Sequence, residues 1–184
     1  MKKTILAAFA AALALSTLTA TAQTKDPKVG GAEMFPSKTI VANAVNSPIH
    51  TTLVAAVKAA GLVDTLNSAG PFTVFAPTDD AFAKLPAGTV GTLVKPENHD
   101  TLAKILTYHV VAGRISSKEL AAWIHKGHGS YALKTVSGGT LTASMRGHSI
   151  ILTDEKGGVS TITTADVFQS NGVIHVVDTV LMPN

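Results

Sequence analysis

The pattern of apolar and turn-forming residues changes at Tyr131, and this change constrains the fold more than any other feature of the sequence. Beyond it, short β-prone runs alternate with glycine-containing turns, and the runs cover residues 131–136, 140–145, 149–153 and 159–164. Runs of this length, separated in this way, predict a meander of antiparallel hairpins. Asn171-Gly172 predicts one further turn, which precedes a strongly apolar closing strand over residues 173–181.

The residues before Tyr131 are mostly helical in pattern. Apolar side chains at helical spacing predict helices over residues 39–45, 48–60, 101–108 and 117–126, with short turns of helix after Thr78 and over 89–94. The expected helix starts are capping residues, namely Ser47, Thr78, Asp100 and the capping box Ser116–Glu119, and the expected stops include Gly61 and Gly127. Short strands are expected over 72–76 and 110–111. Helices first and hairpins later predict an α+β fold in one compact domain.

The first 22 residues have the pattern of a secretory signal peptide. Lys2 and Lys3 precede an apolar run over residues 5–15, and Ala20-Thr21-Ala22 fits the small-x-small pattern of a cleavage site between Ala22 and Gln23. The apolar run is too short to span a bilayer, which needs about 20 residues. We therefore expect a secreted or periplasmic protein that does not span the membrane. Residues 23–37 carry two prolines and two glycines without any sustained period, so we expect an exposed N-terminal arm.

Composition excludes several classes of protein. The 184-residue chain contains no cysteine, which excludes disulfides, thiolate nucleophiles and cysteine-ligated metal centres. Its formal net charge of +3 depends on the leader, because removing Lys2 and Lys3 leaves 13 basic and 12 acidic residues. The remaining basic residues are scattered along the chain. We therefore expect no binding to nucleic acid, which requires a concentrated positive patch.

Three segments carry a resemblance to a known family. They are residues 72–82 (FTVFAPTDDAF), 106–113 (LTYHVVAG) and 171–178 (NGVIHVVD), followed by Leu181-Met182-Pro183. In order and spacing they resemble the fasciclin (FAS1) domain, and the whole chain resembles a secreted bacterial single-domain member of that family. The resemblance covers residues 38–183, which we take as the domain.

The resemblance implies a fold, a class of function and one candidate site. The fold would be a fasciclin-like β-wedge of antiparallel strands flanked by several short α-helices. The protein would be a non-catalytic, monomeric adhesion or interaction module without a cofactor, and its partner a protein or polysaccharide at a cell surface or in a matrix. In animal members, the pair that aligns with Tyr108 and His109 is implicated in adhesion. From the residues alone, a buried, hydrogen-bonded core pair is the favoured interpretation of Tyr108 and His109, and the binding role rests on the resemblance.

Other chemistries find weaker support in the sequence. His125 and His128 lie three residues apart, but Gly127 falls between them and no third ligand is near, so we expect no metal site. Residues 147–151 begin like a nucleophile elbow but lack its final glycine. Asp79-Asp80 is explained by the dipole of the helix that follows Thr78. Two alternatives to the adhesion module remain, a small-ligand binder of the periplasm, favoured by a pocket, and a hydrolase, favoured by clustered titratable groups.

Overall fold

The computed structural model describes residues 26–184, so the predicted signal peptide and its cleavage site between Ala22 and Gln23 lie outside the described residues. Within the described part, no helix is long and apolar enough to cross a membrane. Seven strands form one sheet in the order β2-β1-β7-β6-β5-β4-β3. Their bounds are β1 Phe72–Pro77, β2 Val110–Ala112, β3 Ser130–Lys134, β4 Thr140–Arg146, β5 Ser149–Thr153, β6 Val159–Gln169 and β7 Gly172–Val177.

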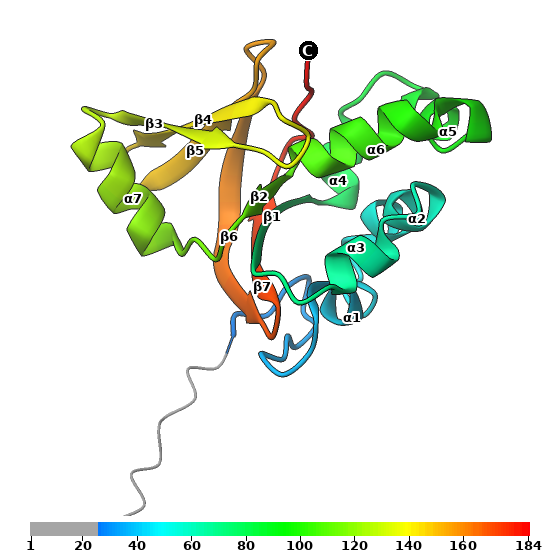
Figure 1. The fold of residues 1–184 in the computed structure, drawn as a ribbon, viewed down its shortest axis with the longest axis horizontal. Helices are drawn as coiled ribbons and strands as arrows, with labels where there is room; N and C mark the ends of the chain where they lie inside the picture. The colour runs from blue at the N-terminus through cyan, green and yellow to red at the C-terminus, as the bar shows by residue number, and fades with distance from the viewer. Residues whose placement is uncertain (1–25) are drawn as a thin grey trace, which may run out of the picture.

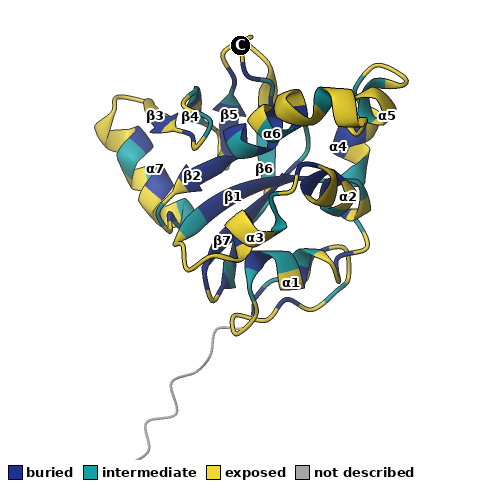
Figure 2. Cartoon of the chain, turned by 45° about the vertical axis from the view of Figure 1, so that its right-hand side comes forward, coloured by how far each residue is buried: buried dark blue, intermediate teal, exposed yellow. Residues whose placement is uncertain are grey.

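The helices flank this sheet on two sides. Figure 1 shows α1 to α6 gathered on one side of the β1–β7 pair, with α7 on the other side against β3, β4 and β5. Their bounds are α1 Ile40–Ala44, α2 Thr51–Ala59, α3 Val63–Asn67, α4 Asp79–Ala83, α5 Thr89–Leu93, the 3₁₀ turn η1 Pro96–Asn98, α6 His99–Tyr108 and α7 Ser117–Lys126. Most helices bury residues on one face and expose the opposite face (Figure 2), whereas α5 and η1 have no buried residue.

One strand pair departs from the predicted antiparallel wedge. β1 and β7 run parallel, with Phe72 opposite Gly172 and Pro77 opposite Val177, whereas every other neighbouring pair is antiparallel. All six residues of β7 are buried. A strand buried on both faces requires a central position, and the place beside β1 supplies it. The expected wedge of antiparallel strands is present, with the β1–β7 pair as its one parallel pairing.

The β1–β7 pair separates two hydrophobic cores. Val74 and Ala76 of β1 face the first core, which the helices α1 to α6 cover, whereas Phe75 faces the second core under α7. In β7, Ile174 and Val176 face the first core and Val177 the second. Because successive side chains of a strand point to opposite faces, one strand pair supplies apolar surface to both cores.

Several predicted boundaries are confirmed. Thr78 caps α4 by accepting a hydrogen bond from the Ala81 amide, and the capping box of α7 forms with both of its hydrogen bonds. Gly61 ends α2 in a left-handed conformation, at a φ of +63°, which favours glycine. Other boundaries differ from the predicted ones. β6 extends to Gln169, β7 ends at Val177, and α3 was not predicted.

Two predicted helix caps are wrong. α2 begins at Thr51 rather than at Pro48, because the Ser47 hydroxyl bonds the His50 imidazole at 2.8 Å and does not cap the helix. Asp100 lies inside the first turn of α6, whose N-cap is Asn98. At the start of α2, the carboxylate of Asp79, a residue distant in sequence, thus takes the capping role predicted for Ser47.

The N-terminal arm is not fully exposed, contrary to the prediction. Val29 and Met34 are buried in the first core, and a turn at Gly30-Gly31 brings the chain back on itself. The Asp26 carboxylate accepts a hydrogen bond from the Phe168 amide of β6. The arm therefore packs as part of the domain, although its two buried apolar residues have no periodic neighbours that would have revealed this.

The first prediction concerns Asp79, which joins two helices. Its carboxylate accepts hydrogen bonds from the Thr51 amide, the Thr51 hydroxyl and the Thr52 amide, at 3.3, 2.7 and 2.8 Å. Burial raises its pKa, but these bonds outweigh burial and hold the pKa below the ordinary 3.8. Asp79→Ala leaves the first amides of α2 without this acceptor, so we expect a loss of about 1–2 kcal/mol in the free energy of unfolding.

The matched control for Asp79→Ala is Asp80→Ala. Asp80 is the adjacent, exposed carboxylate, and it has no hydrogen-bond partner among residues 26–184. Its replacement should change the unfolding free energy by less than about 0.5 kcal/mol in urea titrations. Equal effects of the two variants would contradict the capping role of Asp79.

Candidate functional site

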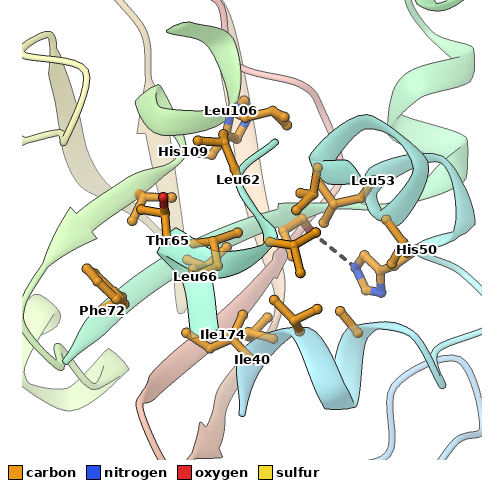
Figure 3. Close-up of a pocket in the computed structure, with 18 of the residues that line it drawn as sticks. Ile40, His50, Leu53, Leu62, Thr65, Leu66, Phe72, Leu106, His109 and Ile174 are labelled. Atoms are coloured by element: carbon orange, nitrogen blue, oxygen red, sulfur yellow. Dashed lines mark hydrogen bonds between the residues drawn. The ribbon is translucent and has the colours of Figure 1, made fainter. Parts of the chain in front are cut away.

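An apolar cavity lies inside the first core, between the helices and the central strands. Its volume is about 70 Å³, and its walls come from α1, α2, α3, α6, β1, β7 and the N-terminal arm. Figure 3 shows side chains from these elements converging on the cavity, among them Ile40, Leu53, Leu66 and Ile174. Val29 and Met34 of the arm close part of the wall.

The polar groups in the inner wall are occupied by internal hydrogen bonds. Ser47 and His50 bond each other, and the second ring nitrogen of His50 lies 3.4 Å from the Ala76 carbonyl oxygen. Burial lowers the pKa of His50, although the Ala76 carbonyl and Asp79 partly oppose this effect. The Thr107 hydroxyl donates to the Ala103 carbonyl within α6. The inner wall consequently presents hydrocarbon surface.

His109 also lines the cavity, and it is fully engaged. Its Nδ1 lies 2.9 Å from the Ile105 carbonyl oxygen, and its Nε2 lies 3.0 Å from the Leu181 amide nitrogen. A carbonyl can only accept and an amide can only donate, so Nδ1 carries the proton and Nε2 accepts. Burial lowers the pKa of His109 to about 4, which keeps the ring neutral at neutral pH.

Tyr108 points to the opposite side, into the second core. Its side chain is completely buried, its hydroxyl donates to the Thr140 carbonyl at 2.7 Å, and it accepts from the Glu155 amide at 3.2 Å. Burial raises the pKa of Tyr108 to about 12. The two residues that the resemblance offered as a binding contact thus have their polar atoms bonded inside the protein. Neither side chain is exposed at the outer surface.

A second, open depression lies between α7 and the sheet. It has a volume of about 300 Å³, and its lining mixes apolar side chains, namely Ala121, Met145, Ile150 and Ile162, with Lys118 and His148. Beside it, the rings of Trp123 and Tyr131 pack at 5.0 Å between centroids. We call this depression the α7 groove.

A row of apolar residues crosses four strands, and those on three of the strands line the α7 groove. Ile162 of β6, Ile150 of β5 and Met145 of β4 follow one another on the sheet face that α7 covers, and Tyr131 of β3 lies diagonally beyond Met145. Met145 and Tyr131 are 40% and 37% exposed. α7 therefore leaves the end of this row open to solvent.

The remaining sequence candidates acquire structural positions. His125 and His128 are exposed near the end of α7, and residues 26–184 contain no group of three side chains that could hold a metal ion. Gly147 and His148 form the β4–β5 hairpin turn, so Ser149 begins a strand. A nucleophile elbow requires a strand-to-helix turn, which this segment does not provide.

Comparison with known proteins identifies the family. The family model of the fasciclin domain matches residues 48–183, which is most of the chain. The chain belongs to the fasciclin domain family. Protein sll1483 of Synechocystis sp. is 47% identical over 159 residues, a match that covers 86% of this chain and 81% of that protein. Cell surface glycolipoprotein MPB83 of Mycobacterium bovis is 35% identical over 145 residues, covering 76% of this chain and 58% of that protein.

A solved structure confirms the fold. The FAS1 domain pair of the insect cell adhesion molecule fasciclin I matches with a TM-score of 0.63 at 22% identity. The match covers 80% of this chain and 51% of that structure. The fasciclin-like α+β fold expected from the three sequence motifs is therefore confirmed, with the parallel β1–β7 pair as its departure from the expected wedge.

The sequence did not reveal either concave site of this fasciclin domain. The cavity draws on Leu62 and Val63, which follow the predicted stop at Gly61 and begin α3. An apolar pair directly after a helix stop is the one signal that could have indicated a further buried turn of helix. The α7 groove depends on which strand residues face α7. The pairing register of the strands determines this, and the sequence pattern does not show that register.

The second prediction tests the structural role of His109. His109→Ala removes the acceptor of the buried Leu181 amide, so we expect a loss of about 1–3 kcal/mol in the free energy of unfolding at pH 7. His148→Ala, at an exposed turn, is the control and should change it by less than about 0.5 kcal/mol. An unchanged melting temperature for His109→Ala, together with lost partner binding, would instead assign His109 a direct contact.

The third prediction concerns the loss of folding stability at acidic pH. The pKa of His109 is about 4 in the folded state and about 6.5 when unfolded, so the unfolded chain binds more protons between these values. Its contribution to stability is complete above pH 6.5 and is lost as the pH falls toward 4, by about 2 kcal/mol between pH 7 and 5. Burial lowers the pKa of His50 and His175 as well, which adds in the same direction.

Urea titrations at pH 7 and 5 measure this loss. His109→Ala should reduce the difference in unfolding free energy between the two pH values. The carboxylates with lowered pKa values, such as Asp79 and Asp178, lose their contributions only below about pH 4 and so do not interfere. A pH difference that is identical in wild type and His109→Ala would refute the assignment.

Proposed function

We propose that this fasciclin domain is a non-catalytic module that acts outside the cytoplasm and docks onto a macromolecule at a cell surface or in a matrix. The observation that carries the proposal is the α7 groove, where partly exposed Met145 stands beside Lys118 and His148, with Tyr131 diagonally beyond Met145 on the same sheet face. Apolar anchors rimmed by polar groups are the usual composition of a docking surface.

The chemistry of the groove favours a protein partner with apolar and acidic side chains. Lys118 lines the groove and is exposed, and it does not pair with an acidic side chain in the described part of the chain. Its floor is aliphatic rather than aromatic, which suits apolar side chains better than sugar rings. We therefore infer a protein segment as the partner, and binding to polysaccharide is the alternative outcome of the test below.

The distribution of titratable groups supports a non-catalytic role. His50, His109 and His175 have lowered pKa values because they are buried, and each bonds a main-chain carbonyl. These three histidines lie in different segments of the chain. Of the three, only His50 bonds a hydroxyl that a base could activate, that of Ser47. That pair faces the interior, away from solvent, where Ser47 is itself buried.

The expected location rests on the leader and on the relatives. The signal-peptide pattern over residues 1–22 predicts export. MPB83 is named a cell surface glycolipoprotein, and fasciclin I a cell adhesion molecule. For Tyr108 and His109 we propose an indirect part in binding, in which they hold the sheet and the C-terminal segment in place beneath the docking surface.

A second candidate function is favoured by the apolar cavity. A concave space lined by hydrocarbon within the first core is suited to a small apolar ligand. This corresponds to the small-ligand binder that the sequence left open, except that the inner wall presents no free polar group to orient a polar ligand.

The fourth prediction tests the α7 groove. Met145→Asp places a carboxylate among its apolar residues, so binding of the processed protein to immobilised cell-envelope proteins should weaken about tenfold or more. Val94→Asp is the matched control, because Val94 is 37% exposed but follows α5 on the other side of the sheet. Melting temperatures of both variants verify folding.

Protease treatment of the envelope fraction separates the two classes of partner. Binding that survives proteolysis, and disappears with a glycosidase, would assign a polysaccharide partner. Equal binding by Met145→Asp, Val94→Asp and the wild type would remove the α7 groove from the docking surface.

A further inference from the structure

The interior of the cavity accepts hydrocarbon only. Its inner polar groups, on Ser47, His50, Thr107 and His109, already have partners within the protein. A ligand oxygen or nitrogen placed there would lose its hydrogen bonds to water without replacement, at a considerable cost in free energy. The part of any ligand that enters the cavity is therefore an alkyl chain or a similar apolar group.

The edge of the cavity has a different composition. Partly buried apolar side chains surround it, among them Val41, Val54, Leu62, Val63 and Phe72. The lining also includes Lys58, in the last turn of α2, and Thr65 of α3, both of which are exposed. These two are the polar side chains of the lining that have no hydrogen-bond or ion-pair partner among residues 26–184.

We propose that the cavity binds a single-chain aliphatic carboxylate, with the end of the chain inside and the carboxylate at Lys58. This inference rests on the second candidate function, small-ligand binding, and specifies its ligand. One unpaired ammonium group at the edge matches one negative charge, and the Thr65 hydroxyl is available to donate to the same head group. A neutral head group would leave the ammonium of Lys58 without this partner.

The dimensions set the length of the chain. At about 10–15 Å³ for each group of the size of a water molecule, a volume of about 70 Å³ holds roughly five to seven such groups. The rest of the chain then lies on the partly buried apolar side chains at the edge, between α1, α2 and α3. A chain of medium length therefore reaches from the interior to Lys58.

Calorimetric titration with decanoate and with decan-1-ol tests the proposal, with decanoate below its micelle-forming concentration and decan-1-ol below its solubility limit in water. We expect both to bind, and decanoate to bind about two- to fivefold more tightly, as a solvent-exposed ion pair allows. Lys58→Gln should abolish this preference. Lys126→Gln is the matched control, because Lys126 is an exposed lysine in the last turn of α7 and does not line the cavity, so it should preserve the preference.

A second variant tests the location. Leu62→Trp adds bulk at the partly exposed edge and should weaken both ligands at least tenfold while the melting temperature shows a folded protein. Failure of both ligands to bind the wild type would overturn the small-ligand function together with this inference. Equal binding of the two ligands, or a preference that persists in Lys58→Gln, would overturn the carboxylate alone. Undiminished binding by folded Leu62→Trp would overturn the placement in the cavity.

Discussion

The parallel pairing of β1 with β7 is the contact on which the rest of the domain depends. These two strands come from opposite ends of the domain sequence, yet each supplies alternate side chains to both hydrophobic cores. Neither core closes without them, because the helices α1 to α6 and the meander under α7 share few other surfaces (Figure 1). Pairing strands so distant in sequence carries an entropic cost of loop closure, which the burial of both strand faces offsets.

The α6–β2 junction explains why a Tyr-His pair belongs in the interior. Tyr108 and His109 are consecutive, and their side chains lie on opposite sides of the junction. Tyr108 bonds the start of β4 and the loop after β5, while His109 bonds the C-terminal segment at Leu181. Two adjacent residues thus attach the meander and the chain end to the same helix. An Ala at position 109 would leave the buried Leu181 amide unpaired, and an Ala at position 108 would remove a partner from two partly buried main-chain groups. These losses are a sufficient physical reason for the two residue types without any contact to a partner.

The sequence predicted what depends on local pattern and missed what depends on distant partners. The α7 capping box, the Thr78 cap and the hairpins after Tyr131 need only neighbouring residues, and each formed as expected. The cap of α2 is the contrary case, because Asp79 replaces the nearer Ser47 through a contact 27 and 28 residues along the chain. The parallel β1–β7 pair, the buried arm and both concave sites also require knowledge of which elements meet. The three motifs nevertheless identified the fold, since a family resemblance contains tertiary information that periodicity lacks.

The same central sheet makes the two proposed sites separable. The cavity lies on the helical side of β1 and β7, with Lys58 and Leu62 at its edge, whereas the α7 groove lies on the face covered by α7. The lining residues of one site do not occur in the other. Substitutions that share no partner and lie far apart act almost additively, so a change at Met145 should leave ligand binding intact and a change at Leu62 should leave docking intact. Any coupling between the sites would have to pass through the β1–β7 pair, which lines the cavity with one face and packs into the second core with the other.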